Sequence, residues 1–160
     1  MKLHYNNVEK IIQKLAEQKQ TISFAESCTG GRIAAAFTAI SGASAVLNGS
    51  MVTYSNDIKH TWLGVGSKIL DTYGAVSSEC VSQMLDGIQK ASSADYALAV
   101  SGIAGPTGGS DEKPVGTVYI GLQTPGTQQV FKCFFEGDRD SIQEQSTAFA
   151  IKKLKEFLEI

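Results

Sequence analysis

The sequence contains no apolar run that approaches the ~18–20 residues needed to span a bilayer, and its first ten residues, MKLHYNNVEK, are too polar for a signal peptide. It also contains no run of basic residues. In total, 14 Lys and Arg residues are balanced by 16 Asp and Glu residues. The formal net charge of −2 provides no general attraction to nucleic acid or to an anionic membrane. We therefore expect a cytoplasmic protein with neither kind of partner, in which a local site holds any anionic ligand.

Cysteine and histidine are too few and too dispersed to form a disulfide framework or a structural metal site. Cys28, Cys80 and Cys133 are odd in number and widely separated, and no CxxC spacing occurs. We expect no metal and no cofactor. A serine or cysteine nucleophile would have only two histidines as a possible base, His4 in a terminal segment and His60 with no obvious acidic residue to orient it. The composition thus disfavours a Ser-His-acid triad.

The arrangement of apolar residues predicts one domain, residues 1–160, with alternating helices and strands. Helices are expected over residues 4–19, 32–37, 56–63, 77–92 and 139–158. Strands are expected over residues 21–25, 49–54, 96–100, 117–123 and 128–136, the last two as a hairpin around Pro125-Gly126. This order predicts a single α/β domain of three layers, α/β/α, with a mixed parallel and antiparallel sheet.

The segment AESCTGG, residues 25–31, places three potential nucleophiles between a predicted strand and a predicted helix. They are Ser27, Cys28 and Thr29. Unpaired backbone N–H groups at a helix N-terminus favour an oxyanion or a phosphate. The same residues also suit an ordinary capped turn, with glycines for tight packing. Taken alone, the segment leaves both interpretations open.

Two cations and one loop are further candidates. Lys59 and Arg139 each fall in the first turn of a predicted helix, where the macrodipole disfavours a cation. Lys59 is either an ordinary solvated lysine, which its position alone favours, or a general base whose pKa is lowered by desolvation. Arg139 is either a surface residue or a phosphate ligand. The loop SGIAGPTGGSDEKPVG, residues 101–116, follows a buried strand at the edge where α/β sheets bind ligands, and we expect a binding loop.

Together these segments resemble the C-terminal domain family of the competence/damage-inducible protein CinA, whose stand-alone members include nicotinamide-nucleotide amidases. The matching stretches are AESCTGG (25–31), VTYSNDIKHTWLGV (52–65), YGAVS (73–77), SGIAGPTGGSDEKPVGTVYIGL (101–122) and GDR (137–139). They follow one another in order along nearly the whole chain. The molybdopterin-binding-like domain that precedes this domain in full-length CinA proteins has no counterpart in the sequence, so we expect a stand-alone member.

The resemblance implies hydrolysis of the carboxamide of nicotinamide mononucleotide (NMN) to nicotinic acid mononucleotide and ammonia. It implies Ser27 as the nucleophile, neutral Lys59 as its base, and Tyr54 as a proton relay or a support for Lys59. The substrate-binding residues expected are Thr29, Gly30, Gly31, Ser101, Gly102, Ala104, Gly105, Thr107 and Arg139. In this interpretation the N–H groups of the turn at 29–31 stabilise the oxyanion, and Arg139 with the loop holds the phosphate and ribose. Many relatives have a basic residue where this chain has Gln143. Members of the family commonly self-associate, so we expect a homo-oligomer.

Three alternatives accompany this hypothesis. Cys28 is a rival nucleophile, because a helix N-terminus lowers the pKa of a thiol. The chain could instead be a non-catalytic nucleotide-binding or assembly module that keeps the pocket of the family. It could also be an amidase that acts on a different pyridine carboxamide.

Overall fold

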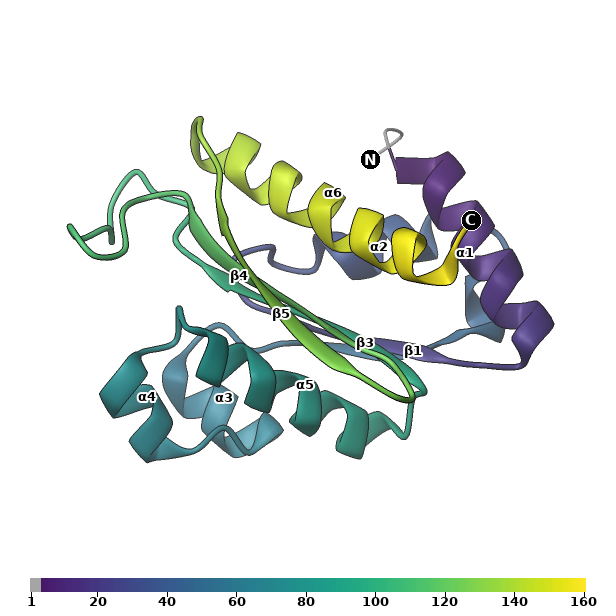
Figure 1. Cartoon of the computed structure of the whole chain (residues 1–160), viewed down its shortest axis with the longest axis horizontal. Helices are drawn as coiled ribbons and strands as arrows, with labels where there is room; N and C mark the ends of the chain where they lie inside the picture. The colour runs from purple at the N-terminus through teal and green to yellow at the C-terminus, as the bar shows by residue number, and fades with distance from the viewer. Residues whose placement is uncertain (1–3) are drawn as a thin grey trace.

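The computed structural model describes residues 4–160, in which a five-stranded sheet lies between two layers of helices (Figure 1). The strands are β1 (Ile22–Glu26), β2 (Leu47–Val52), β3 (Tyr96–Gly102), β4 (Thr117–Gln123) and β5 (Gln128–Phe134). Their order in the sheet is β2-β1-β3-β4-β5. β1 pairs in parallel with β2 and β3, and the pairs β3–β4 and β4–β5 are antiparallel. The predicted mixed sheet is confirmed.

The helices are divided between the two faces of the sheet. One face is covered by α1 (Tyr5–Gln18), α2 (Arg32–Thr38) and α6 (Arg139–Leu158), and the other by α3 (Asn56–Leu63), α4 (Ser67–Tyr73) and α5 (Ser78–Ser92) (Figure 1). A short 3-10 helix, Ala43–Ala45, precedes β2. The sequence pattern predicts no helix over residues 67–73, because this segment is short and buries only Leu70 among its residues. Glycines at both of its ends, Gly66 and Gly74, bound α4 in the structure.

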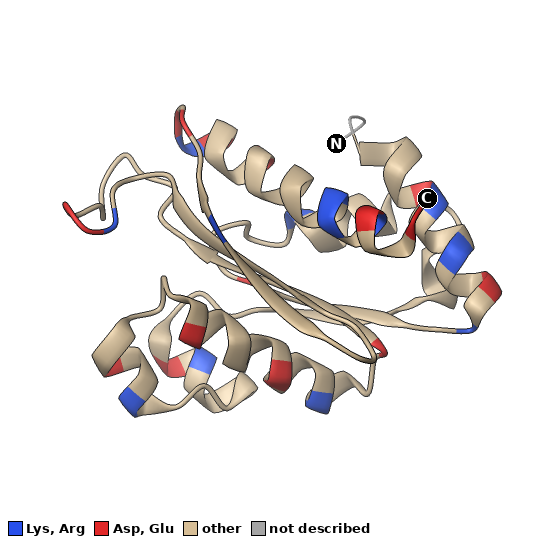
Figure 2. Cartoon of the chain, in the orientation of Figure 1, with Lys and Arg blue, Asp and Glu red and all other residues tan. Residues whose placement is uncertain are grey.

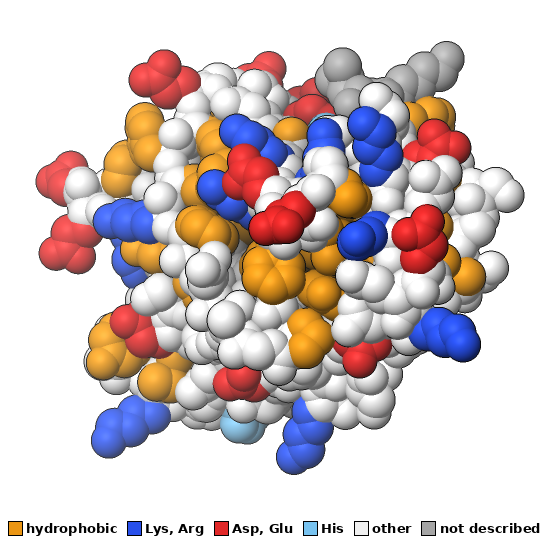
Figure 3. Space-filling view, turned by 45° about the vertical axis from the view of Figure 1, so that its right-hand side comes forward, with side chains coloured by type: hydrophobic (Ala, Val, Ile, Leu, Met, Phe, Trp, Pro, Cys, Tyr) orange, Lys and Arg blue, Asp and Glu red, His pale blue; other side chains and the backbone are white. Residues whose placement is uncertain are grey.

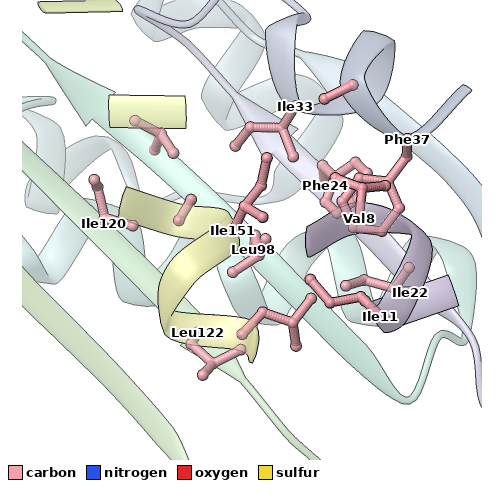
Figure 4. Close-up of a cluster of buried hydrophobic side chains, with 14 of the residues drawn as sticks. Val8, Ile11, Ile22, Phe24, Ile33, Phe37, Leu98, Ile120, Leu122 and Ile151 are labelled. Atoms are coloured by element: carbon pink, nitrogen blue, oxygen red, sulfur yellow. The ribbon is translucent and has the colours of Figure 1, made fainter. Parts of the chain in front are cut away.

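The core consists of one apolar cluster on each side of the sheet, and β3 contributes to both. Leu98 packs with residues of α1, α2 and α6 in the cluster drawn in Figure 4, whereas Ala97 and Ala99 face α5. This alternation explains why the run Tyr96–Val100 is almost continuously apolar, since a strand covered on both faces has no solvent side. The central strands are therefore held rigidly, together with the residues at their carboxyl ends.

Charged residues lie mainly on the helices and in the loops (Figure 2). On the face seen in Figure 3, both signs of charge are interspersed among hydrophobic side chains. Within residues 4–160, no helix combines the length and the apolar character needed to cross a membrane.

Helix α3 approaches α5 closely at Gly87, in the interior of α5. A Cβ atom at this position would overlap the backbone carbonyl of Leu63, the last residue of α3. Leu63 is one turn beyond Lys59 on the same face of α3, and both residues are buried. The absence of a side chain at residue 87 therefore helps to set the position of the helix that carries Lys59.

We expect Gly87→Ala to lower the free energy of unfolding, although alanine is the better helix former by about 1 kcal/mol. The added methyl group must push α3 away from α5, and such overpacking typically costs about 1–3 kcal/mol. Equilibrium unfolding in urea measures the change. The control is Gly126→Ala in the β4–β5 turn, where no atom lies within 4 Å of a Cβ. A Gly87→Ala variant as stable as the wild type would show that this contact does not constrain α3.

Candidate active site

The carboxyl ends of β1, β2 and β3 meet at one edge of the sheet, where they border a cavity of about 310 Å³. The connection between α4 and α5, the loop after β3 and the first residue of α6 complete its wall. Most of the site residues predicted from the sequence line it, namely Ser27, Tyr54, Lys59, Ser101, Gly102, Ala104, Gly105, Thr107 and Arg139. Segments that lie far apart in the chain thus converge on one cavity.

Ser27 and Lys59 form a hydrogen-bonded pair at the bottom of this site. Ser27 directly follows β1, and its Oγ lies 3.0 Å from Nζ of Lys59. Nζ also lies 2.7 Å from the carbonyl oxygen of Thr53 and 3.2 Å from that of Tyr54. Lys59 is only 1% exposed, and in residues 4–160 no carboxylate is within salt-bridge distance of its amine. Lys59 is therefore not a solvated surface lysine, the interpretation that its position in the sequence favoured.

Burial lowers the pKa of Lys59 from its usual value of 10.5, because the charged form loses its hydration. Two neighbouring thiols oppose this effect only weakly, since burial raises the pKa of Cys28 to about 12 and that of Cys80 to about 11, which keeps both uncharged near neutral pH. When Lys59 is neutral, two N–H bonds donate to the carbonyls of Thr53 and Tyr54. The lone pair then faces Ser27, whose hydroxyl donates to it. The amine is thus positioned to remove the proton of Ser27.

The turn after Ser27 is built around the buried carboxylate of Glu26, the last residue of β1. Its Oε1 accepts hydrogen bonds from Oγ1 of Thr29 at 2.7 Å and from N–H of Ile33 at 3.0 Å, and its Oε2 accepts one from N–H of Ala34 at 3.0 Å. The N-cap of α2 is Gly31, which has no side chain that could accept these bonds. Glu26 therefore caps α2 from the preceding strand, and its negative charge suits the positive end of the helix.

This arrangement bears on the role expected of Thr29, Gly30 and Gly31. Thr29 is fully buried and donates to Glu26, while N–H of Gly30 donates to the carbonyl of Ser27 at 3.0 Å. Gly31 has a φ of 100°, a conformation that a residue with a side chain rarely adopts. None of the three lines the cavity. The side chain of Thr29 and the N–H of Gly30 thus serve the shape of the turn, and the expected oxyanion role of the N–H groups at 29–31 stays a prediction.

Tyr54 and Arg139 meet at the rim. Tyr54 is 63% exposed, and its hydroxyl accepts a hydrogen bond from Nη2 of Arg139 at 2.9 Å. Nη1 of Arg139 donates to the carbonyl of Gly105 at 2.7 Å. The guanidinium group thus joins the β2–α3 connection to the loop after β3. Tyr54 supports Lys59 through its backbone carbonyl, whereas its phenol is directed to Arg139.

Several residues of the site were not predicted from the sequence. Cys28, named from the sequence only as a rival nucleophile, lines the cavity, as do Ala75 and Val76 from the α4–α5 connection. The matching stretch YGAVS, residues 73–77, was the available signal for the latter pair. Nε2 of Gln143 donates to the carbonyl of Cys28 at 2.9 Å and so supports the turn that carries Ser27. The family comparison marked position 143, but the contact of Gln143 with Cys28 has no signal in the sequence, because the two residues are far apart in the chain.

The fold and the site define a class of three-layer α/β proteins with a buried Ser–Lys pair at the carboxyl edge of parallel strands. Residues 5–158 match the family model of the CinA C-terminal domain. The chain belongs to this family.

Named relatives agree with this assignment. The chain is 44% identical over 150 residues to a "CinA-like protein" of Pseudothermotoga lettingae, with 92% of this chain and 37% of the relative covered. It is 45% identical over 153 residues to a "Putative competence-damage inducible protein" of Clostridium beijerinckii, with 95% and 37% covered. The chain therefore spans well under half the length of these curated relatives.

Solved structures are similar over nearly the whole chain. The competence damage-inducible protein A (ComA) of Klebsiella pneumoniae superposes with a TM-score of 0.93 at 34% identity, covering 97% of this chain and 96% of that one. The competence/damage inducible protein CihA of Agrobacterium tumefaciens has a TM-score of 0.93 at 39% identity, covering 98% and 95%.

We expect Lys59→Met to raise the free energy of unfolding near neutral pH, because the buried amine of the wild type costs stability. The pKa of Lys59 in the folded state lies below 10.5, its value in the unfolded state. At a pH between these two pKa values the unfolded state binds more protons than the folded state. The free energy of unfolding of the wild type should therefore rise with pH toward 10.5. Lys59→Met should lose this part of the rise. Urea unfolding at about pH 7 and about pH 9.5 measures the difference. Lys68→Met, which removes an exposed lysine of α4, is the control. An unchanged slope in Lys59→Met would contradict the burial argument.

Proposed function

We propose that this domain is an amidohydrolase that converts NMN and water to nicotinic acid mononucleotide and ammonia. The observation that carries the proposal is the buried pair of Ser27 and Lys59, 3.0 Å apart, in which the amine has only uncharged hydrogen-bond partners. A serine hydroxyl is a weak nucleophile until an adjacent base removes its proton. A lysine whose pKa is lowered by burial is suited to act as that base.

In the proposed acylation step, neutral Lys59 accepts the hydroxyl proton of Ser27 while Oγ attacks the carboxamide carbon. The new C–O bond forms, and the π electron pair of the carbonyl moves to its oxygen. When this pair returns, the C–N bond breaks, and the leaving amine takes the proton from Lys59 and departs as ammonia. Water then attacks the acyl-enzyme with Lys59 again as the base, which releases the carboxylate and restores Ser27.

The shape and charge of the cavity support a small substrate with an anionic group. Its volume of about 310 Å³ falls at the lower end of the roughly 300–1,000 Å³ typical of small-molecule sites. Arg139 presents a guanidinium group at the rim, a suitable partner for a phosphate. The loop after β3 contributes Gly102, Ala104, Gly105 and Thr107 to the lining, where a ribose could contact it. The positive charge of the pyridinium ring in NMN would make its carboxamide more electrophilic.

A non-catalytic nucleotide-binding or assembly module is the second candidate. A binding site gains nothing from a buried amine that costs stability and contacts a serine hydroxyl, so the Ser27–Lys59 pair favours catalysis. An amidase for another pyridine carboxamide would use the same Ser27 and Lys59 chemistry. It would differ only in the substrate group that Arg139 and the other residues at the rim bind. Self-association, which the family resemblance implies, stays a prediction that sedimentation of the purified chain tests.

We expect the purified protein to release ammonia from NMN, and Ser27→Ala and Lys59→Met each to lower kcat by about 10³-fold or more, because nucleophile and base act as a unit. A coupled ammonia assay measures the rates, and Ser44→Ala, an exposed serine of the 3-10 helix, is the control. Activity that survives Ser27→Ala but is lost in Cys28→Ala would transfer the nucleophile to Cys28.

The pH profile provides a second measurement on the same proteins. The rate should fall as pH falls through the pKa of Lys59, which lies below 10.5, because the protonated amine cannot accept the proton of Ser27. Ammonia release from nicotinamide, its riboside or NAD but not from NMN would favour the other-carboxamide alternative. No release from any of them would favour the binding module.

We expect Arg139→Ala to raise KM for NMN by about 10–100-fold, since a hydrogen bond to a charged group contributes roughly 1.5–3 kcal/mol. The riboside of nicotinamide lacks the phosphate, so its kcat/KM should change much less. Steady-state kinetics of the wild type and Arg139→Ala on both substrates measure this difference in kcat/KM. An equal loss on both substrates would show that Arg139 acts through Tyr54 and the loop rather than on the phosphate.

A further inference from the structure

Ser101 lies beside Ser27 on the neighbouring strand. β1 and β3 are parallel with Glu26 opposite Val100, and N–H of Ser27 donates to the carbonyl of Val100 at 3.0 Å. This hydrogen bond extends the ladder by one residue and makes Ser101 the direct neighbour of Ser27. Adjacent strands are about 4.8 Å apart, so one small reacting group in the cavity can contact both side chains.

Both serines project from the same face of the sheet. In β3, Ala97 and Ala99 face α5, and Ser101 continues this alternation. In β1, Ala25 faces α5, and Ser27 is next on that side. Lys59 reaches Ser27 from α3, which covers this same face. Two hydroxyl groups and the amine thus border the same end of the cavity.

The hydroxyl of Ser101 has no hydrogen-bond partner among the side chains and backbone of residues 4–160, although Ser101 is only 1% exposed and lines the cavity. Nζ of Lys59 is already directed to Ser27, Thr53 and Tyr54, so Ser101 is not part of the proton transfer. This hydroxyl borders the cavity, unlike the unpartnered hydroxyl of Ser23, which is sealed in the core. A partner for Ser101 can come from a ligand in the cavity.

The reaction requires a donor for the negative charge on the carboxamide oxygen, and several N–H groups at the start of α2 are already engaged within the protein. N–H groups of Ile33 and Ala34 donate to Glu26, and that of Gly30 donates to the carbonyl of Ser27. The N-terminus of α2 therefore has these N–H groups occupied within the protein.

We propose that the hydroxyl of Ser101 is an oxyanion donor of this site, an inference that rests on the proposed amidohydrolase function. As the bond between Oγ of Ser27 and the carboxamide carbon forms, the π electron pair moves to the oxygen, and the Ser101 hydroxyl donates a hydrogen bond to it while keeping its own proton. When the pair returns and the C–N bond breaks, this hydrogen bond weakens. Attack of water on the acyl-enzyme forms the same kind of oxyanion, so Ser101 serves both steps.

The test compares Ser101→Ala with Ser101→Thr and with Ser23→Ala. Loss of one oxyanion donor typically lowers kcat by about 10²–10³-fold, and we expect this loss in Ser101→Ala with KM changed far less. Ser101→Thr keeps a hydroxyl and should recover most of kcat. Ser23 is a matched control, since it is on the same face of β1 and its hydroxyl is also unpartnered, but it is sealed in the core away from the cavity. Ser23→Ala should keep wild-type kcat.

The pH profile separates a role on the oxyanion from a general disturbance of the site. Ser101 makes no hydrogen bond to Lys59, so the midpoint of the acidic limb should be the same in Ser101→Ala and the wild type. A shifted midpoint, an unchanged kcat, or a raised KM at unchanged kcat would each overturn the oxyanion role.

A probe that does not depend on NMN keeps this inference distinguishable from the proposed function. Diisopropyl fluorophosphate forms a bond from Oγ of Ser27 to phosphorus, fluoride leaves, and the serine proton passes to Lys59. Intact mass measures the rate, which should fall in Ser101→Ala and not in Ser23→Ala. If the wild type fails to hydrolyse NMN but shows this pattern, the substrate is wrong and the role of Ser101 stands. If it hydrolyses NMN and Ser101→Ala labels and turns over like the wild type, the inference fails alone. Neither ammonia release nor labelling in the wild type would overturn both.

Discussion

The burial of one amine is the constraint on which the site depends. Lys59 has no carboxylate partner, and its amine is held by two backbone carbonyls and one hydroxyl. Backbone carbonyls at the end of β2 cannot move without disrupting the sheet, so the direction of the amine is set by the fold rather than by a flexible side chain. The cost of desolvating this lysine is offset by the two apolar clusters that hold the sheet and its helices together.

A second constraint is the use of a helix N-terminus inside the protein. In many α/β proteins such a terminus binds an anionic ligand. Here Glu26, which belongs to the same strand end as Ser27, occupies it and orders the turn that presents the nucleophile. The N–H groups of α2 that donate to Glu26 cannot also bind a ligand, but they hold the turn that carries Ser27 in place. Ser101 on the adjacent strand and Arg139 at the rim face the cavity.

The site is closed by contacts between segments that are distant in the chain. Arg139, at the start of α6, bridges Tyr54 and the loop after β3, and Gln143 holds the carbonyl of Cys28. Lys113 of the loop donates to the carbonyl of Tyr73 at the end of α4. These bonds join the nucleophile turn, the loop and the helices on both faces of the sheet, so the rim has the same rigid frame as the strands beneath it.

Apolar periodicity and motif order are local properties of the chain, and they were enough to predict the alternation of helices and strands, the burial of β3 and the family. The sequence also placed Ser27, Lys59, Ser101 and Arg139 among the candidates. It could not decide between a solvated and a buried Lys59, since burial depends on how α3 packs against α5. It did not indicate that the side chain of Thr29 donates to Glu26, because nothing local shows that Glu26 folds over its own turn. Register between parallel strands, which only the tertiary structure decides, is what brings the hydroxyls of Ser27 and Ser101 side by side.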